Sequence, residues 1–111
     1  MKPIVKEIIE FSILKEIAYN NTIPTPKNYN IDESTYVSLF KDMLNKHYIN
    51  PKRVLFNILG DVEIENEIDL VTSLGNQYIE SQEGWNKMYN NLSDLNKLLD
   101  VEVKNDWFHT K

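Results

Sequence analysis

The chain has 111 residues, of which 41% are hydrophobic and 26% are charged, with a formal net charge of −5 and no cysteine. This length suits one globular domain with a single core, and the apolar fraction is too high for a disordered chain. A chain without cysteine has no disulfide framework, thiolate nucleophile or Cys-based metal site, so we expect a cytoplasmic protein.

Charge is distributed unevenly along the chain. Residues 1–59 hold eight Lys or Arg against six Asp or Glu, a net charge of +2, whereas residues 60–111 hold four against eleven, a net charge of −7. DNA binding gains most of its affinity from neutralised phosphates, so this balance disfavours a general nucleic-acid binder. It leaves room for a small basic face.

The first predicted element is a helix from Pro3 to about Tyr19. Proline is tolerated in a first helical turn, and the apolar residues that follow recur at helical spacing until Asn20 and Asn21 end the helix. Lysine and glutamate interrupt the apolar residues throughout, so we expect neither a signal-peptide core nor a membrane span. The apolar positions are Ile4, Ile8, Ile9, Ile13, Leu14, Ile17 and Ala18.

Two further helices are predicted before residue 46. A short one begins at Pro26, in the segment TIPTPKNYN. A longer one is capped by Asn30, with Glu33 placed as in a capping box, and its buried stripe is Tyr36, Leu39, Phe40, Met43 and Leu44. Short polar side chains on the opposite face suit contact with DNA bases, although such a face is more often simply solvated. They are Ser34, Thr35, Ser38, Lys41 and Asn45.

After Tyr48 the apolar residues recur every second position, which predicts a β-hairpin, the wing, over about residues 49–70. Val54 to Leu59 form its first strand and Gly60-Asp61 its turn. In the returning segment apolar and acidic residues alternate, which gives the hairpin one acidic face. The alternating residues are Val62, Ile64, Ile68 and Leu70 against Glu63, Glu65, Glu67 and Asp69.

C-terminal helices are predicted over about residues 72–99, followed by a polar tail, residues 100–111. Thr72 caps the first of these helices. The tail holds an aromatic pair, Trp107-Phe108, for which we expect a surface on the domain or on a partner. The last helix carries Trp85, Met88, Tyr89, Leu92, Leu95, Leu98 and Leu99.

This order of elements is that of a winged helix-turn-helix domain. We therefore predict an α+β, predominantly helical fold in which residues 1–99 form one winged-helix domain with a β-hairpin wing and C-terminal helices. A glycine such as Gly75 costs about 1 kcal/mol inside a helix relative to alanine. The second wing strand returns to the body beside it, so we expect close backbone packing there, with Tyr78 and Ile79 facing the core.

Three stretches carry a resemblance to a known family: NIDESTYVSLFKDMLNKHYI (30–49), VTSLGNQYIES (71–81) and EGWNKMYNNL (83–92). With the hairpin they resemble the YjcQ-like family of small bacterial and phage proteins, from about Phe11 to Leu99. The most specific piece is G-x-x-Y-I followed by W-x-K-x-Y at Trp85, Lys87 and Tyr89. The resemblance implies a winged-helix domain more than a function, because the role of that family is largely uncharacterised. The residues to which we assign structural roles are Gly75, Tyr78, Trp85 and Tyr89.

Two features depart from the family's pattern. His47 precedes Tyr48-Ile49 where a helix-ending glycine is commoner, so we expect it to adopt the left-handed conformation. The wing carries Lys52 and Arg53 at its start but is otherwise acidic, which disfavours contact between the wing and phosphates.

No pattern of catalytic residues is present in the sequence. His47 and His109 are the two histidines, far apart and outside any metal or triad pattern. The sequence contains neither of the glycine motifs that bind phosphate groups, G-x-x-x-x-G-K-S/T and G-x-G-x-x-G. Alternate acids on a strand face lie about 7 Å apart, too far to share one cation. We therefore expect no enzyme activity, metal or cofactor.

A heptad rhythm of apolar residues runs for two repeats through the last predicted helix. It fits the seam of a homodimer, and it fits packing on the first helix of the same chain equally well, because two heptads are short for a self-sufficient coiled coil. The residues of this candidate dimer seam are Trp85, Met88, Leu92, Leu95 and Leu99.

Two functions remain open. The first is a DNA-binding, transcription-regulatory protein of phage or mobile-element type, with the third helix in the major groove of double-stranded DNA. Base contacts would come from Ser34, Thr35, Ser38 and Asn45, and phosphate contacts from Lys27, Lys41, Lys46, Lys52 and Arg53. The second is a protein–protein interaction module, such as a phage inhibitor of a host factor, that acts through its acidic wing and C-terminal half.

Overall fold

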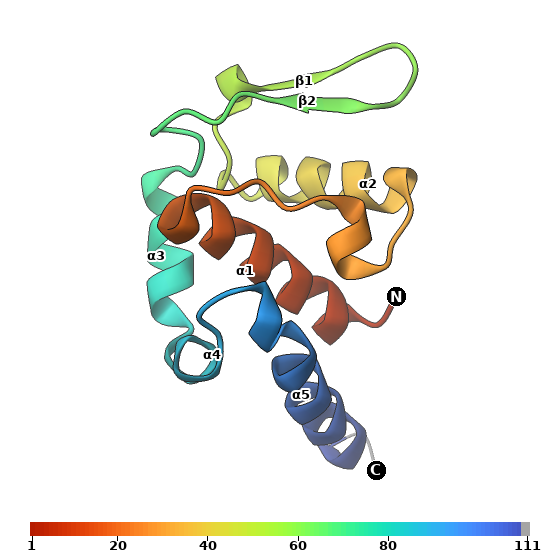
Figure 1. Ribbon diagram of the computed structural model, residues 1–111, viewed down its shortest axis with the longest axis vertical. Helices are drawn as coiled ribbons and strands as arrows, with labels where there is room; N and C mark the ends of the chain where they lie inside the picture. The colour runs from red at the N-terminus through yellow and green to blue at the C-terminus, as the bar shows by residue number, and fades with distance from the viewer. Residues whose placement is uncertain (110–111) are drawn as a thin grey trace.

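The chain folds into a mostly helical α+β arrangement, in which a short antiparallel hairpin comes between two groups of helices in the chain and lies at one end of the molecule (Figure 1). The computed structural model describes residues 1–109, and no helix in that range has both the length and the apolar composition needed to cross a membrane. This confirms the predicted fold class in outline and is consistent with a winged-helix arrangement. The elements are α1 (Pro3–Asn20), a 3₁₀ helix (Pro26–Tyr29), α2 (Glu33–Asn45), a 3₁₀ turn (Pro51–Arg53), β1 (Val54–Phe56), β2 (Val62–Ile64), α3 (Ser73–Ser81), α4 (Glu83–Met88), a 3₁₀ turn (Leu92–Asp94) and α5 (Leu95–His109).

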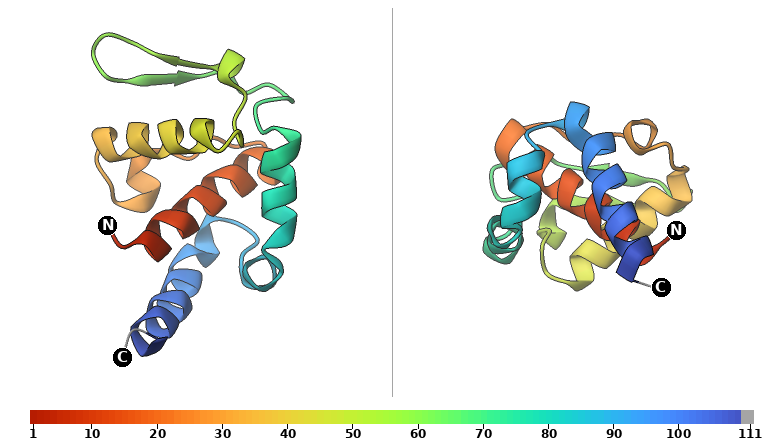
Figure 2. Two further views of the ribbon diagram at one scale, coloured as in Figure 1. Left: turned by 180° about the vertical axis from the view of Figure 1, so that it is seen from behind. Right: turned by 90° about the horizontal axis from the view of Figure 1, so that it is seen from below.

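α1 is the central element of the fold. Every residue from Ile8 to Ile17 is buried, and α2, α3 and α5 pack around the helix (Figures 1 and 2). A helix that is apolar around most of its circumference is buried in this way rather than presenting one face to water. As predicted, α1 begins at Pro3 and ends at Asn20, where Asn21 turns the chain in the left-handed conformation with a φ of 51°.

Polar side chains on α1 bind to the surrounding elements. Ser12 Oγ lies 2.9 Å from the hydroxyl of Tyr29 and 2.6 Å from the hydroxyl of Tyr89. Lys15 Nζ donates to Asn86 Oδ1 at 2.8 Å and to the carbonyl of Tyr89 at 2.7 Å. Because Ser12 and Lys15 both have partners, α1 enters the core without leaving that hydroxyl or that ammonium group unsatisfied.

The N-terminal cap of α2 differs from the prediction. Asp32, not Asn30, is the capping residue, and its Oδ1 accepts a hydrogen bond from the backbone N–H of Thr35 at 2.8 Å. Asn30 instead ends the preceding 3₁₀ helix in the left-handed conformation, with a φ of 55°. Asparagine favours both positions, so the sequence alone did not separate them, and the capping box with Glu33 does not form.

The connection from α2 to the hairpin turns at His47, whose φ of 64° lies in the left-handed region as predicted. The N–H of Tyr48 then donates to the carbonyl of Met43 at 3.0 Å. This bond satisfies one of the last free carbonyls of α2. Ile49 forms an isolated antiparallel bridge with Val71, which brings the start and the end of the wing segment together at the body.

The hairpin is shorter than predicted, with three residues in each strand. Leu55 and Glu63 pair across it and project into solvent. The regular alternation also stops early, because the chain leaves the strand after Ile64 and the side chain of Ile68 is fully exposed. The residues of the half-buried face, which packs on the core, are Val54, Phe56, Val62 and Ile64.

Gly75 lies against the backbone of the chain that enters the hairpin. Thr72 caps α3 as predicted, with its hydroxyl accepting from the N–H of Gly75 at 3.1 Å. A β-carbon built on Gly75 would lie 2.5 Å from the carbonyl oxygen of Tyr48 and 2.7 Å from a methyl carbon of Val71. That carbonyl already accepts the N–H of Thr72, so it has little freedom to move away.

The prediction that one continuous helix carries the candidate dimer seam, from Trp85 to Leu99, is wrong. The chain leaves the helical path between α4 and α5, because the side chain of Tyr89 turns into the core and the N–H of Leu92 donates to Glu16 Oε1 at 3.0 Å. The heptad positions therefore do not share one helix face. Leu95 is a core residue with 6% of its surface exposed. The half-buried members of the seam are Trp85, Met88, Leu92 and Leu99.

The segment predicted as a polar tail continues α5 as far as His109. This helix points away from the body, at the opposite end of the molecule from the hairpin (Figures 1 and 2). The prediction for Trp107 and Phe108 concerns side chains that lie outside the described ones. A homodimer stays a prediction.

We expect Gly75→Ala to lower the free energy of unfolding by more than about 1 kcal/mol, because the added methyl group is forced against a hydrogen-bonded carbonyl. Gly84 provides a matched control in α4, since nothing lies within 4 Å of a β-carbon built there. Gly84→Ala should raise the stability by up to about 1 kcal/mol. Urea denaturation of both variants checks this, and a neutral Gly75→Ala would contradict the close approach.

We expect Leu95→Glu to unfold the domain, because it places a carboxylate without a partner in the core. Val101→Glu, on the same helix at a position 38% exposed, should retain the wild-type circular dichroism spectrum. Light scattering of the wild type and of Leu95→Glu separates the two explanations of the heptad rhythm. If the wild type is a dimer and Leu95→Glu is a folded monomer, Leu95 belongs to a dimer seam and not to the core.

Candidate nucleic-acid interface

The residues predicted to contact bases lie on the outward face of α2. Ser34, Ser38, Lys41 and Asn45 follow one another at intervals of four, three and four positions and are all exposed, and Thr35 is half-buried beside them. The opposite face of the helix is buried in the core. Thirteen residues give α2 a length of about 20 Å, which suits an element that lies in a major groove.

Hydrogen bonding leaves part of this face free for a ligand. Ser34 Oγ already donates to Asp32 Oδ1 at 3.2 Å. Among the side chains described, those of residues 1–105, Ser38 and Asn45 have no hydrogen-bonding partner. Hydrogen bonds from Thr35 lower the pKa of Asp32, so a carboxylate stands at the N-terminal end of α2. A phosphate is therefore expected toward the middle or the C-terminal end of the helix.

Lys46 is held by acidic residues of its own chain. Its Nζ lies 2.8 Å from Glu10 Oε1 on α1 and 3.0 Å from Asp42 Oδ2 one turn earlier on α2. Lys6 Nζ approaches the same oxygen of Asp42 at 3.2 Å. Although burial opposes it, hydrogen bonding to both carboxylates raises the pKa of Lys46. The predicted phosphate contact through Lys46 would thus first require these ion pairs to break.

Glu10 is a buried carboxyl group with one unsatisfied oxygen. Only 2% of its surface is exposed, and its Oε2 has no hydrogen-bonding partner. Burial raises the pKa of Glu10 to about 7, with a further contribution from the carboxyl group of Asp42 and an opposing one from Lys46. The hydrogen bond from Glu10 lowers the pKa of Asp42 to about 2. The two carboxyl groups thus shift each other's pKa in opposite directions, as expected of a coupled pair.

Arg53 is occupied in the same way at the base of the hairpin. Its Nε donates to Asp69 Oδ1 at 2.8 Å, and its two terminal nitrogens reach Asp69 Oδ2 at 3.2 Å and Glu65 Oε2 at 3.1 Å. These bonds join the chain before β1 to the chain after β2. Arg53 thus braces the hairpin, and the acidic residues that looked like a free face in the sequence are partly its partners.

Three of the five predicted phosphate contacts remain unpaired. Within residues 1–105, no carboxylate forms an ion pair with Lys27, Lys41 or Lys52. Lys41 Nζ lies 5.4 Å from the ring centroid of Phe56, which places it between α2 and β1. The basic face is therefore smaller than predicted. Of these ion pairs, the one between Asp42 and Lys46 could have been predicted from the sequence, because residues four apart on a helix lie side by side.

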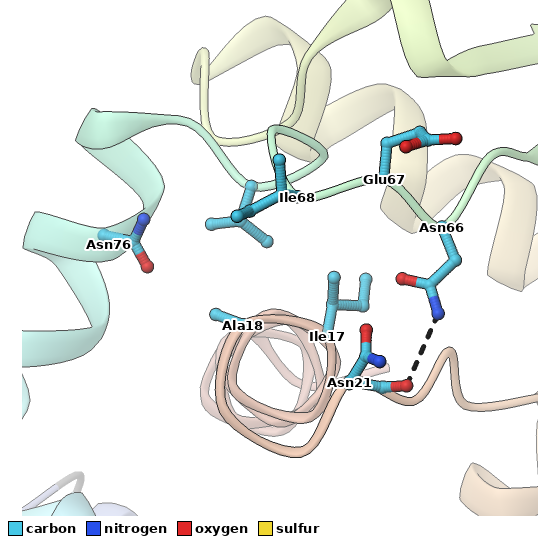
Figure 3. A pocket seen from close by; sticks show the side chains of 8 residues that line it. Ile17, Ala18, Asn21, Asn66, Glu67, Ile68 and Asn76 are labelled. Atoms are coloured by element: carbon cyan, nitrogen blue, oxygen red, sulfur yellow. Dashed lines mark hydrogen bonds between the residues drawn. The ribbon is translucent and has the colours of Figure 1, made fainter.

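A hollow of about 480 Å³ lies on another side of the molecule, between the end of α1, the segment after β2 and the start of α3 (Figure 3). Its floor is apolar, and its polar groups are mainly the amides of Asn21, Asn66 and Asn76. Asn66 Nδ2 donates to the carbonyl of Asn21 at 3.4 Å. Neutral amides offer no phosphate-binding charge. In the described part of the chain, no three His, Cys, Asp or Glu side chains gather where they could share a metal ion.

Comparison with known proteins does not identify this chain: no family model matches it, and neither a curated protein nor a solved structure matches it significantly. The resemblance to the YjcQ-like family therefore stays a prediction. The candidate interface rests on the geometry of α2 and the hairpin.

The buried carboxyl group of Glu10 gives a prediction about pH. Its pKa is about 7 in the folded chain against 4.5 for an ordinary glutamate, so between these values the folded state binds more protons than the unfolded state. Stability contributed by this group is complete below about pH 4.5 and falls as pH rises through 7, by up to about 1.4 kcal/mol per pH unit.

Glu10→Gln mimics the protonated form and should remove this fall. Urea denaturation at pH 5, 6, 7 and 8 measures it as a difference in slope between the wild type and Glu10→Gln. Glu80→Gln, at an exposed position of α3, is the control and should follow the wild type. Equal slopes for Glu10→Gln and the wild type would show that Glu10 is ionised throughout this range.

Proposed function

We propose that this chain is a winged-helix regulatory protein that binds double-stranded DNA through α2. The observation that carries the proposal is the outward stripe of α2, where Ser38, Lys41 and Asn45 are exposed and form no hydrogen bond or ion pair within the described residues. The order of a short helix, a longer helix and a hairpin after α1 supports the same proposal, because the recognition helix of a helix-turn-helix domain is the second helix of its motif.

The exposed side chains of α2 have the chemistry of base readout. An asparagine amide pairs with adenine through two hydrogen bonds, a serine hydroxyl accepts or donates to several bases, and lysine binds guanine or a phosphate. Asn45 and Lys41 stand in the C-terminal half of the helix, away from the carboxylate of Asp32. We expect that half to enter the groove.

The phosphate footprint in this proposal is small. Lys46 and Arg53 are held in ion pairs, so the available cations are Lys41, Lys52 and Lys27. The acidic hairpin is expected to stay off the phosphates, because each exposed carboxylate near the backbone of DNA adds repulsion. Specific binding of this kind relies on base contacts more than on charge.

We expect a salt dependence that reports about three phosphates. With three lysines neutralised, affinity should fall about 40-fold between 50 and 200 mM salt. The measurement is fluorescence anisotropy with a duplex selected from a pool of random 20-base-pair DNA. Lys41→Ala should weaken binding several-fold and reduce the salt slope by about one. Lys97→Ala, an exposed lysine on α5, should change neither.

Lys46 is unsuitable for this test, because its replacement by glutamate would leave Glu10 and Asp42 without their cation and threaten the fold. Binding that is indifferent to Lys41, or the absence of any selected duplex at 50 mM salt, would reject the proposal. The second function, a protein–protein interaction module, is favoured by a separate observation on the hairpin.

A further inference from the structure

Three large apolar side chains of the hairpin face solvent. Ile58 is 102% exposed, Leu59 83% and Leu55 62%. The other exposed large apolar residues of the described chain are spread over different elements. Single exposed apolar residues are ordinary on a protein surface, whereas three on one short projecting element point to a contact surface.

The turn of the hairpin does not need its apolar residues. Asn57 Oδ1 accepts the N–H groups of Leu59 at 2.9 Å and Asp61 at 3.1 Å, and Gly60 supplies the left-handed conformation with a φ of 88°. The side chains of Ile58 and Leu59 take no part in these bonds. Polar residues at positions 58 and 59 would form the same turn. The fold therefore does not explain why these positions hold isoleucine and leucine.

A hollow of about 530 Å³ also lies at the base of the hairpin, between the segment before β1 and the two strands. Val54, Leu55 and Ile64 give it apolar walls, and its charged lining residues are Lys52, Arg53, Glu63 and Glu65. Arg53 is paired with Glu65, whereas Glu63 forms no ion pair within residues 1–105 and lies beside the exposed Leu55. We call Leu55, Ile58, Leu59, Asp61 and Glu63 the wing surface.

Backbone groups at both edges of the hairpin are unpaired. The bonds from Glu65 to Arg53 and from Asn57 to Asp61 fix which residue pairs face inward, so the outer backbone groups of Phe56, Val62 and Ile64 point away from the ladder. Within residues 1–109, no other backbone group bonds to these three residues at the edges. An extended segment laid along such an edge gains main-chain hydrogen bonds.

Charge identifies the chemistry of the occupant. Residues 51–69 contain two basic and five acidic side chains, a net charge of −3. The same surface of a second copy would bring the same charge to the contact and would be repelled. We propose that the wing surface binds an extended segment of another protein in which apolar residues alternate with lysine or arginine. This inference does not rest on DNA binding by α2.

Synthetic peptides test this chemistry directly with the whole chain. The main probe is a fluorescent 12-residue peptide of alternating valine and lysine. A serine–lysine peptide and a valine–glutamate peptide have the same length and alternation. Anisotropy should show that the valine–lysine peptide binds at least tenfold more tightly than either control. Amide NMR shifts on its addition should concentrate in residues 52–65.

Variants assign the binding to the wing surface. Ile58→Ser combined with Leu59→Ser should weaken binding of the valine–lysine peptide at least tenfold while the circular dichroism spectrum stays unchanged. Leu74→Ser, at a position of α3 that is 51% exposed, should bind as the wild type does. Asp61→Asn combined with Glu63→Gln should weaken binding several-fold, and Glu80→Gln should have no effect.

Four results would overturn the proposal. They are equal binding of the serine–lysine peptide, unchanged binding by the Ile58→Ser and Leu59→Ser double variant, and no binding of the valine–lysine peptide at millimolar concentration. The fourth is a wild-type dimer, seen by light scattering, that the double variant abolishes, because the occupant would then be a second copy. Loss of DNA binding in Lys41→Ala with peptide binding intact would separate the two proposals.

Discussion

The fold depends on burying α1 on every side. A helix surrounded by α2, α3 and α5 cannot turn its polar residues to water, so Ser12, Lys15 and Glu10 must find partners within the protein. Ser12 and Lys15 find them around Tyr89, and Glu10 finds Lys46 and Asp42. These partners belong to both the N-terminal and the C-terminal parts of the chain. The polar residues of one helix therefore determine how the other helices are placed, and burial of apolar area alone would be far less specific.

Pairing within the protein also decides which basic side chains are available to bind a ligand. Lys46 and Arg53 read as surface charges in the sequence, yet both are used to hold the molecule together. Lys41 differs because the adjacent Asp42 is paired with Lys6 and Lys46, and because Lys41 itself lies over the ring of Phe56. A count of basic residues in the sequence therefore overstates the surface available to an anion. Available charge is what remains after the internal pairs have formed.

Local patterns predicted the parts of the fold that local physics controls. Helix periodicity located α1, Thr72 and Pro26 began helices where expected, and the left-handed His47 followed from its place at a helix end. The predictions failed where a distant contact decided the outcome. The heptad rhythm from Trp85 to Leu99 could not reveal that Tyr89 bonds to Ser12 on α1 and breaks the helix. Neither could the sequence show that Glu10 is buried beside Asp42, because that pairing joins residues on two different helices.

The distance along the chain between α1 and its partners has a consequence for how the protein is made. Ser12 contacts a residue 77 positions later, and Lys15 one that lies 71 positions later. During synthesis α1 is thus made before Asn86 and Tyr89, which bind Lys15 and Ser12, whereas Tyr29 and Lys46 follow it sooner. Until Asn86 and Tyr89 are added, Lys15 lacks its hydrogen-bonding partners, so we expect the burial of this part of α1 to be completed late. An N-terminal fragment released before α4 is complete would expose α1 to aggregation and to proteases.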